Sequence, residues 1–277
     1  MKFIKTTFSG GLGNQLFQYA TARALMKKGD LLLFDTSNYS NDYLERNFTL
    51  HHYEVKGRIL SNRYLKKIFT PLTKANRFID RFGLFGHIKE QGFSVHEKLV
   101  EQCRLFTTIE GYWQSESYFI SIREQLLREM EPHCVTNFPA CMQHSETVAV
   151  HVRREDYLKD DRYGFLGEDY YRNALNIIKQ KLSNPTIIFF SDDMLWCKKV
   201  FENDSIFFCE DPVWKDDFLQ LYLMSKCKHQ VIANSSFSWW GAWLNKNVNK
   251  IVIRPAEPFR DVSLYYENHY PSDWIAI

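Results

Sequence analysis

The stretches TVAVHVRR (residues 147–154) and PTIIFFSDD (residues 185–193) show the pattern that decides the fold of this chain. Each is a short, continuous apolar run that ends in charged residues, and the amphipathic segment DYYRNALNIIKQKL (169–182) lies between them. Continuous apolar runs of this length are typical of parallel strands that helices cover on both faces. The region therefore predicts two parallel strands joined by a helix.

Strand and helix keep alternating on both sides of this region. Further strands are predicted at 205–211, 229–234 and 249–255, and further helices at 194–201, 216–227 and 235–246. The chain begins in the same way, with a strand at 2–8, a helix at 16–29 and a strand at 31–35. Residues 130–146 lose the periodicity and contain two prolines, which favours a domain crossover. We expect an α/β protein of two domains.

Composition argues against several classes of protein. With 35 basic and 33 acidic residues in 277, the chain lacks the strong positive charge of a nucleic-acid binder, so no nucleic acid partner is expected. The six cysteines form no CxxC or CxxxC pair, which favours reduced thiols over a zinc site or disulfides. The sequence shows neither a signal-peptide pattern nor an apolar run of about 18 residues, so we expect a cytoplasmic protein.

Residues 56–90 are rich in positive charge, with nine Lys or Arg against two acids. We interpret them as a helical layer with a solvated basic face. The alternative is peripheral contact with an anionic membrane surface, at the inner face of the membrane, or with a charged glycan.

Polar side chains gather where the predicted parallel strands end, which is the edge at which such sheets bind ligands. They are His151, Arg153, Arg154, Glu155 and Asp156 after the first strand, Ser191, Asp192 and Asp193 after the second, and Asn234, Ser235 and Ser236 after a third. Arginine matches phosphate oxygens and can stabilise a leaving diphosphate, or it can simply pair with neighbouring acids at the surface. The carboxylates of SDD either bind a metal or reach ribose or base N–H groups. We favour the metal-free use, because the arginines already supply positive charge.

The stretch NSSFSWWGAWLN (234–245) combines two features. Its serines stand at a predicted helix start, where they cap the helix and where backbone N–H groups bind phosphate. We expect two of its three tryptophans to face the sheet as core.

Near the N-terminus, GGLGNQ (10–15) fits neither a dinucleotide fingerprint nor a P-loop, but its glycines let a ligand approach, and Asn14 and Gln15 can bind a sugar hydroxyl.

Five blocks of sequence together resemble the bacterial α-1,2-fucosyltransferases of glycosyltransferase family 11. They are GGLGNQLFQYA (10–20), EGYWQSESYF (110–119), HVRREDY (151–157), FFSDDMLWCK (189–198) and NSSFSWWGAWLN (234–245). The blocks follow the order of the family and span nearly the whole chain. The resemblance implies an inverting transfer of L-fucose from GDP-β-L-fucose to the 2-hydroxyl of a terminal galactose, without a required metal or another cofactor.

The resemblance also implies a GT-B-like fold, with two Rossmann-like domains, a parallel sheet in each and an interdomain cleft. We expect an acceptor-side domain at 1–145, a GDP-fucose-binding domain at 146–260 and a tail at 261–277 that packs back on the N-terminal domain. The expected partners are GDP-fucose and a galactoside oligosaccharide or lipid-linked glycan, in the synthesis of a surface polysaccharide or O-antigen.

Roles follow from the resemblance residue by residue. His151 and Arg153 match the block that meets GDP; Arg153 is expected to neutralise the departing β-phosphate, and Asp156 to support that loop. Glu155 stands where relatives commonly have glycine, so it either weakens donor binding or points to solvent. Arg154 and Ser191 are also expected on the donor side, and Asp192 and Asp193 are expected to contact guanine or ribose. The residues expected to contact the diphosphate are Asn234, Ser235, Ser236 and Phe237. The cleft and acceptor side holds Gly11, Gly13, Asn14, Gln15, Tyr112 and Gln114, of which Asn14 joins Arg153 and Asp156 in the catalytic set.

The general base and two rival functions stay open. Asp35, Glu110, Glu168 and Asp169 are the candidate bases, and a late proton transfer without a strong base is a further alternative. One rival function is a transferase for another nucleotide sugar or linkage. The other is a nonenzymatic glycan-binding protein, which would have little use for a cluster of arginines and acids.

Overall fold

The computed structural model describes the chain except for residues 40–46, 61–82, 91–98, 134–137, 203–205 and 265–267. It divides into two compact units. The first comprises Met1–Glu131 and Tyr266–His269, and the second comprises Pro132–Tyr265 and Tyr270–Ile277. The predicted ranges differ from these units, because residues 138–145 lie with the second unit, where Cys141 and Met142 pack against its core. The predicted tail is also shared between the two units.

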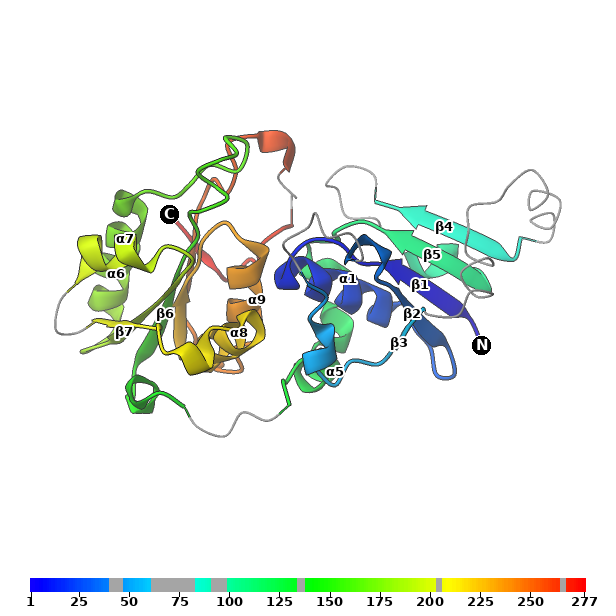
Figure 1. Ribbon diagram of the computed structural model, residues 1–277, viewed down its shortest axis with the longest axis horizontal. Coiled ribbons are helices and arrows are strands. Elements are labelled where there is room, and N and C mark those ends of the chain that lie inside the picture. The colour runs from blue at the N-terminus through cyan, green and yellow to red at the C-terminus, as the bar shows by residue number, and fades with distance from the viewer. Residues whose placement is uncertain (40–46, 61–82, 91–98, 134–137, 203–205, 265–267) are drawn as a thin grey trace. The chain divides into compact units, whose positions relative to one another are not determined.

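The first unit contains a parallel sheet, whose described strands follow the order β3-β2-β1-β5-β4. These strands are β1 (Phe3–Thr7), β2 (Leu31–Asp35), β3 (Arg58–Ile59), β4 (Phe85–Lys89) and β5 (Phe106–Glu110). Its described α-helices are α1 (Leu12–Ala24), α4 (Leu99–Gln102) and α5 (Arg123–Glu129). Strand β1 lies in the middle of the sheet (Figure 1), so the glycine loop after it opens at the centre of the carboxyl edge.

The second unit contains another parallel sheet, with its described strands in the order β11-β10-β9-β6-β7-β8. These strands are β6 (Thr147–Val152), β7 (Thr186–Ser191), β8 (Ile206–Phe208), β9 (His229–Val231), β10 (Val252–Arg254) and β11 (Ile275–Ala276). Its described α-helices are α6 (Glu168–Lys181), α7 (Met194–Phe201), α8 (Asp217–Lys226) and α9 (Ser236–Trp243). Strands β9, β6 and β7 are neighbours, so the three polar strand ends of the sequence meet at one edge.

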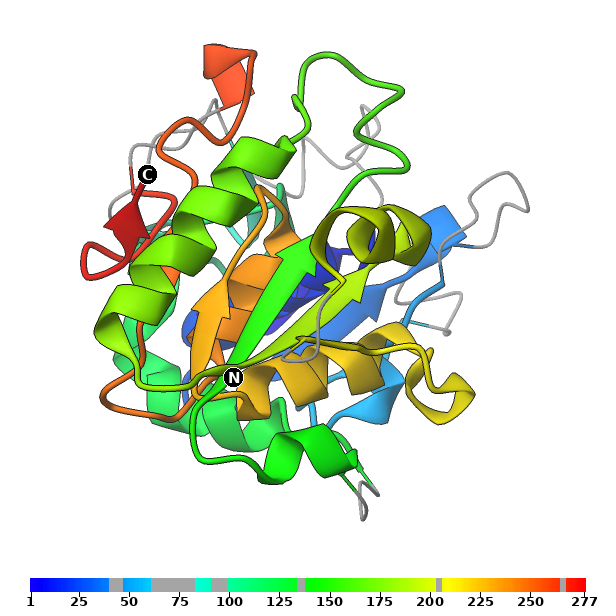
Figure 2. The same ribbon diagram turned by 90° about the vertical axis from the view of Figure 1, so that its left-hand side faces the viewer.

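Helices cover both faces of the second sheet, which explains why β6 is buried at every residue. Val148 and Val150 pack with residues of α6 and α7, whereas Ala149 packs with residues of α8 on the opposite face. Figure 2 shows α6 on one side of these strands and α8 on the other. The prediction of a parallel sheet covered on both faces is confirmed.

Helix α9 carries more core than the sequence predicted. Trp239, Trp240 and Trp243 are all buried, and the ring of Trp239 also lies 5.6 Å from that of Trp274. Outside residues 56–90 the predicted strands and helices of both units are otherwise confirmed, with shifted ends at α1, which spans Leu12–Ala24 rather than 16–29. Gly11 caps this helix, and the amide of Gln15 donates to the carbonyl of Gly11, so the first helical turn forms within the glycine loop.

The interpretation of residues 56–90 as a helical layer is wrong at 58–59 and 85–89, which form strands β3 and β4. Most of the remaining range, on which the alternative of membrane contact also depends, falls on 61–82, which lie outside the described residues. In the part of the chain that the structure does describe, no helix has both the length and the apolar character needed to cross a membrane.

Candidate functional site at the carboxyl edge of the second sheet

Arg153 lies directly after β6 and is held by two carboxylates. Its Nε and Nη2 donate to Oδ1 and Oδ2 of Asp156 at 2.8 and 2.7 Å, and its Nε lies 3.3 Å from Oδ2 of Asp192. Burial disfavours the charge, but the carboxylates of Asp156 and Asp192 raise the pKa of the guanidinium above its ordinary value. The side chain is still 30% exposed, so Arg153 is a fixed cation that a ligand can reach.

Arg154 has a different environment from its neighbour. Its guanidinium carbon lies 4.3 Å from the ring centroid of Trp196 and 4.8 Å from that of Phe165, and its Nε donates to Asp193 at 2.9 Å. The side chain is only 12% exposed. Arg154 was predicted to bind the donor, but the structure packs it between aromatic rings, where it ties the loop after β6 to the start of α7.

The SDD carboxylates also support this loop. Asp192 accepts hydrogen bonds from the backbone amides of Arg154 (2.9 Å) and Glu155 (3.2 Å). Asp193 caps α7 by accepting a hydrogen bond from the amide of Trp196, and its own backbone amide donates to Oγ of Ser191. Contact with guanine or ribose, the predicted role of both aspartates, would compete with these bonds. Glu155 is exposed.

His151 is a buried, neutral imidazole at this edge. It is 4% exposed, and its ring centroid lies 5.3 Å from that of Phe237 at the start of α9. Burial, with a smaller contribution from the charge of Arg153, lowers the pKa of His151 to about 3. The ring therefore carries no charge at neutral pH and can serve a ligand only through hydrogen bonding or packing.

Asn234 links three loops at the end of β9. Its Nδ2 lies within hydrogen-bond distance of the carbonyl oxygens of Tyr163 (3.0 Å), Gly164 (2.9 Å) and Pro258 (2.5 Å). Its own carbonyl accepts from the phenol of Tyr157 at 3.0 Å. Asn234 is 2% exposed, so the structure places it as a link between loops rather than on the surface that a donor would touch.

Ser235 and Ser236 begin α9 as the sequence predicted. Ser235 is the capping residue, and its side chain accepts a hydrogen bond from the amide of Phe237. Ser236 and Phe237 are partly exposed. The first turn of α9 therefore presents backbone N–H groups beside Arg153 and His151, which suits a phosphate group.

Several buried polar atoms at this edge lack a hydrogen-bond partner among the described residues. They include Nδ1 of His151, Nη1 of Arg154 and Oδ1 of Asn234. Buried polar groups in folded proteins are nearly always paired, so a concentration of unpaired ones favours a site whose partners come from a ligand or from water. All three come from strand ends that the sequence placed together.

In the first unit, the glycine loop is organised around Gly10, which the sequence did not single out. Gly10 has φ +78°, and a Cβ added to it would lie 2.5 Å from Nδ2 of Asn14. Asn14 in turn accepts a hydrogen bond from Gln114 at 2.8 Å. The structure thus brings together two predicted acceptor-side residues, and glycine is required at position 10 for Asn14 to lie against the loop.

Gln15 and Gly13, which were also predicted for the cleft, lie inside the unit. Gln15 is 0% exposed; its amide donates to the carbonyls of Gly10 and Asn47 and accepts from Thr49. Gly13 is buried in the first turn of α1, and Gly11 is the partly exposed capping residue. Gln15 therefore supports the loops around Gly10 and has no spare polar atom for a sugar. By contrast, Tyr112 is 41% exposed.

The structure places all four candidate residues but does not single out one of them as the general base. Asp35 pairs with Lys5 at 3.2 Å. Burial alone would raise the pKa of Asp35, but the hydrogen bonds from Ser37 and Lys5 lower it below its ordinary value, which makes the carboxylate a weaker base. Glu110 ends β5 and lies 3.2 Å from His87. Glu168 and Asp169 are exposed in the first turn of α6.

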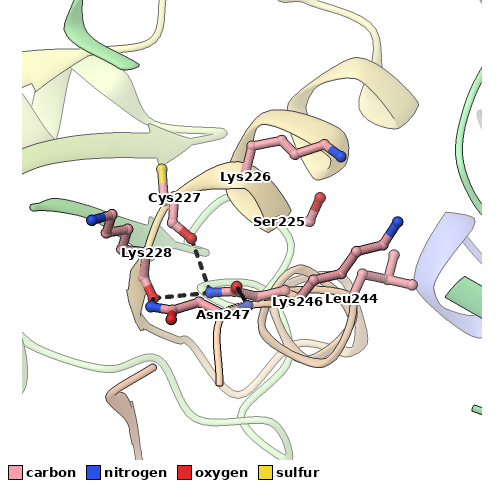
Figure 3. A pocket seen from close by; sticks show the side chains of 8 residues that line it. Ser225, Lys226, Cys227, Lys228, Leu244, Lys246 and Asn247 are labelled. Carbon is pink, nitrogen blue, oxygen red and sulfur yellow. Dashed lines mark hydrogen bonds between the residues drawn. The ribbon is translucent and has the colours of Figure 1, made fainter. Parts of the chain in front are cut away.

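A pocket of about 160 Å³ lies at the opposite edge of the second sheet and has a structural explanation (Figure 3). Its lining residues are Ser225, Lys226, Cys227, Lys228, Leu244, Asn245, Lys246 and Asn247. Lysines at this place complement the carbonyl ends of α8 and α9, and Asn245 donates to the carbonyls of Cys227 and Lys228. None of the predicted site residues lines this pocket, so we place the functional site at the carboxyl edge.

The described residues contain no group of three or more His, Cys, Asp or Glu side chains arranged to hold a metal ion.

Comparison with solved structures shows the class of fold. A mutant of Arabidopsis thaliana FUT1 in complex with GDP aligns with a TM-score of 0.50 at 12% identity, over 99% of this chain and 76% of that one. The predicted fold class is confirmed: the chain has a GT-B-like fold of two α/β units, each with a parallel sheet.

The sequence matches the family described as Glycosyl transferase family 11 over residues 3–277, and the chain belongs to that family. Alpha-1,2-colitosyltransferase of Escherichia coli is 30% identical over 100% of this chain and 99% of its own. The O-antigen biosynthesis glycosyltransferase WbnK of Escherichia coli is 30% identical over 91% of this chain and 93% of its own. Galactoside 2-alpha-L-fucosyltransferase Sec1 of Mus musculus is 23% identical over 97% of this chain and 72% of its own.

The sequence analysis assigned no role to two further residues, Tyr157 of the second unit and Gln18 of the first, which hold the loops of their own units. Tyr157 stacks on Tyr163, with ring centroids 5.1 Å apart, and bonds the carbonyl of Asn234. Gln18 donates to the carbonyl of Gly111 and so joins α1 to the loop after β5. Both act through backbone carbonyl groups distant in sequence, and no local motif signals such contacts.

Proposed function

We propose that this chain is an inverting galactoside α-1,2-fucosyltransferase. It moves L-fucose from GDP-β-L-fucose to the 2-hydroxyl of a terminal galactose, in the synthesis of a surface polysaccharide or O-antigen. The observation that carries the proposal is Arg153, fixed by Asp156 and Asp192 near His151, whose ring lies against Phe237 in the first turn of α9. Membership of family 11 and the name of the mouse relative support the sugar and the linkage, and the name of WbnK supports O-antigen synthesis.

In the proposed reaction the galactose 2-hydroxyl attacks C1 of fucose from the face opposite GDP. The new C1–O bond forms as the bond from C1 to the β-phosphate oxygen breaks, and the electron pair of that bond passes to GDP. Arg153 and the backbone N–H groups of α9 meet the charge that grows on the phosphate. The hydroxyl proton passes to a base or to solvent. Since these groups supply the positive charge, no metal is needed.

A related donor is the second candidate, because one relative at 30% identity is a colitosyltransferase. Colitose differs from fucose by the absence of the 3-hydroxyl. A site that hydrogen-bonds this hydroxyl would reject the colitosyl donor strongly, since its polar groups would be left without partners. Measuring kcat/KM for GDP-fucose and GDP-colitose with one acceptor decides between the two sugars.

The first test is release of GDP from GDP-fucose with and without lactose, in EDTA, with the product linkage read by NMR. Lactose-dependent release with a Fucα1-2Gal product is the expected result. GDP binding without release from any galactoside would remove the acceptor from the proposal. Failure to bind GDP would remove the donor as well.

The role of Arg153 is tested with a matched arginine of the same loop. Arg153→Ala is expected to lower kcat by about 100- to 1,000-fold, the effect of removing one donor that stabilises a leaving group. Arg162, 64% exposed and paired with Asp160, provides the control Arg162→Ala, which is expected to change kcat little. A loss below about tenfold for Arg153→Ala, with GDP binding retained, would contradict the role of Arg153.

A further inference from the structure

The loop after β5, residues 111–115, has an unusual backbone that its own sequence does not favour. Gly111 has φ +154°, and Trp113 has φ +58°, a conformation that bulky residues rarely adopt. Trp113 is also 1% exposed. A loop of this shape persists only where its surroundings hold it, and such loops are frequent at functional sites. We call residues 111–115 the β5 loop.

The carboxylate of Glu90 holds the centre of the β5 loop. Its Oε2 accepts from the backbone amide of Tyr112 at 2.7 Å, and its Oε1 accepts from that of Trp113 at 2.9 Å. The amide of Glu90 donates to the carbonyl of Glu110, which places Glu90 beside the end of β5. Two successive N–H groups thus form an anion-binding nest, and a side chain of the protein itself supplies the anion.

Gly111 is required for this arrangement. A Cβ added to Gly111 would lie 2.5 Å from Cβ and 2.7 Å from Oε2 of Glu90. Together with its positive φ, this close approach leaves room for glycine alone. The shape of the loop and the position of the carboxylate therefore depend on each other.

Segments distant in sequence hold the two ends of the β5 loop. Gln18 donates to the carbonyl of Gly111 at 3.2 Å. At the other end, the carbonyl of Gln114 bonds the ring of His269 at 3.0 Å, and Oγ of Ser115 donates to the carbonyl of Asn268 at 2.7 Å. These bonds fix the loop from start to end.

The β5 loop is mostly buried and presents two side chains, those of Tyr112 and Gln114. Trp113 and Ser115 are buried, whereas Tyr112 is 41% exposed. The amide of Gln114 points to Asn14, to which it donates at 2.8 Å. An exposed aromatic ring next to fixed amides has the chemistry that binds a neutral sugar, with the ring against its C–H face and the amides on its hydroxyls.

We propose that Glu90 is a positioning residue for the acceptor: it holds the β5 loop in the shape that presents Tyr112 and Gln114 to the galactoside. This inference rests on the proposed function. Glu90 acts through the backbone amides of Tyr112 and Trp113, since both of its oxygens are engaged there. Its loss is expected to affect the acceptor and to leave donor binding unchanged.

Glu90→Gln tests the proposal because it keeps the size of the side chain and replaces one accepting oxygen by an NH2 group that faces an N–H. We expect the KM for lactose to rise at least about tenfold while the Kd for GDP stays within about twofold. Amide hydrogen exchange at Tyr112 and Trp113 is expected to accelerate. Glu90→Asp keeps the charge but shortens the reach, and should give a smaller effect. Glu101→Gln, an exposed acid of α4 in the same unit, is the matched control and should change none of these values.

Each result bears on a separate part of the proposal. Unchanged exchange at Tyr112 and Trp113 in Glu90→Gln would overturn the positioning of the loop. Faster exchange with an unchanged KM for lactose would overturn its link to the acceptor. Wild-type protein that binds GDP but transfers to no galactoside would overturn the proposed function and the acceptor role with it, while the exchange data would still decide whether Glu90 holds the loop.

Discussion

Replacing His151 by Phe should make the second unit less sensitive to acid. His151 is 4% exposed, and burial lowers its pKa to about 3. In the unfolded chain the same group titrates near its ordinary pKa of 6.5. The unfolded state therefore binds a proton as the pH falls through 6.5, and the folded state does not until the pH is near 3. The stability that neutral His151 allows is present above pH 6.5 and is lost progressively below it.

The magnitude follows from the two pKa values. One pKa unit corresponds to about 1.36 kcal/mol, and protonation of the unfolded state costs about 2 kcal/mol of unfolding free energy between pH 7 and pH 5. The wild-type protein should lose this amount over that range, and His151→Phe should not. Phenylalanine fits the aromatic contact with Phe237, which limits the packing change. Any packing cost cancels when each variant is compared with itself at the two pH values.

The assay is urea unfolding followed by tryptophan fluorescence at pH 7 and pH 5. Six of the seven tryptophans lie in the second unit, so the signal reports mainly on the unit that contains His151. His144→Phe, at an exposed position in the same unit, is the control and should keep the pH dependence of the wild type. If the wild type and His151→Phe lose the same unfolding free energy between pH 7 and pH 5, the reasoning is refuted, because His151 would then titrate alike in the folded and the unfolded chain.

Two further predictions concern the loops of the two units. Asn234→Ala removes an amide that lies within hydrogen-bond distance of three carbonyl oxygens, and it should lower the free energy of unfolding, measured in urea, by about 2–3 kcal/mol. The control Asn249→Ala, at an exposed position, should change this free energy by less than about 0.5 kcal/mol. Equal effects of the two substitutions would show that the link between the loops does not stabilise the fold. Gly10→Ala and Gly29→Ala both place alanine at a positive φ, but only at position 10 does the new Cβ come within 2.5 Å of Asn14. Gly10→Ala should therefore lower the melting temperature more than Gly29→Ala and should also reduce activity. Equal melting temperatures of the two variants would contradict this expectation.

The sequence was sufficient to predict a parallel sheet covered on both faces, because its apolar runs are continuous. Strand β6 is buried along its whole length, and its run of valines and alanine shows this directly. The boundary between the units was harder to place. Cys141 and Met142 pack against the second core from a segment without periodicity, and a contact of that kind leaves no regular pattern in the sequence.

The position of the site was predictable for the same reason, since strand ends in a parallel sheet share one edge. The division of labour within the site was not. Arg153 and Arg154 are adjacent and identical in type, and their difference comes from Trp196 and Phe165, which the fold brings to one of them. Sequence position gives no information about which guanidinium is packed and which is exposed.

That division suits the proposed chemistry. Asp156 and Asp192 engage Nε and Nη2 of Arg153, and these bonds do not involve its Nη1. An arginine that is to meet a leaving diphosphate needs both properties, because it must be oriented before the charge develops and must still offer N–H groups to that charge. Lysine offers a single mobile ammonium and cannot be oriented by a bidentate carboxylate. Arg154 makes this orientation durable by anchoring the same loop to α7 through Asp193 and Trp196. The pair of arginines is therefore best understood as one cation for the ligand and one support that keeps the first in place.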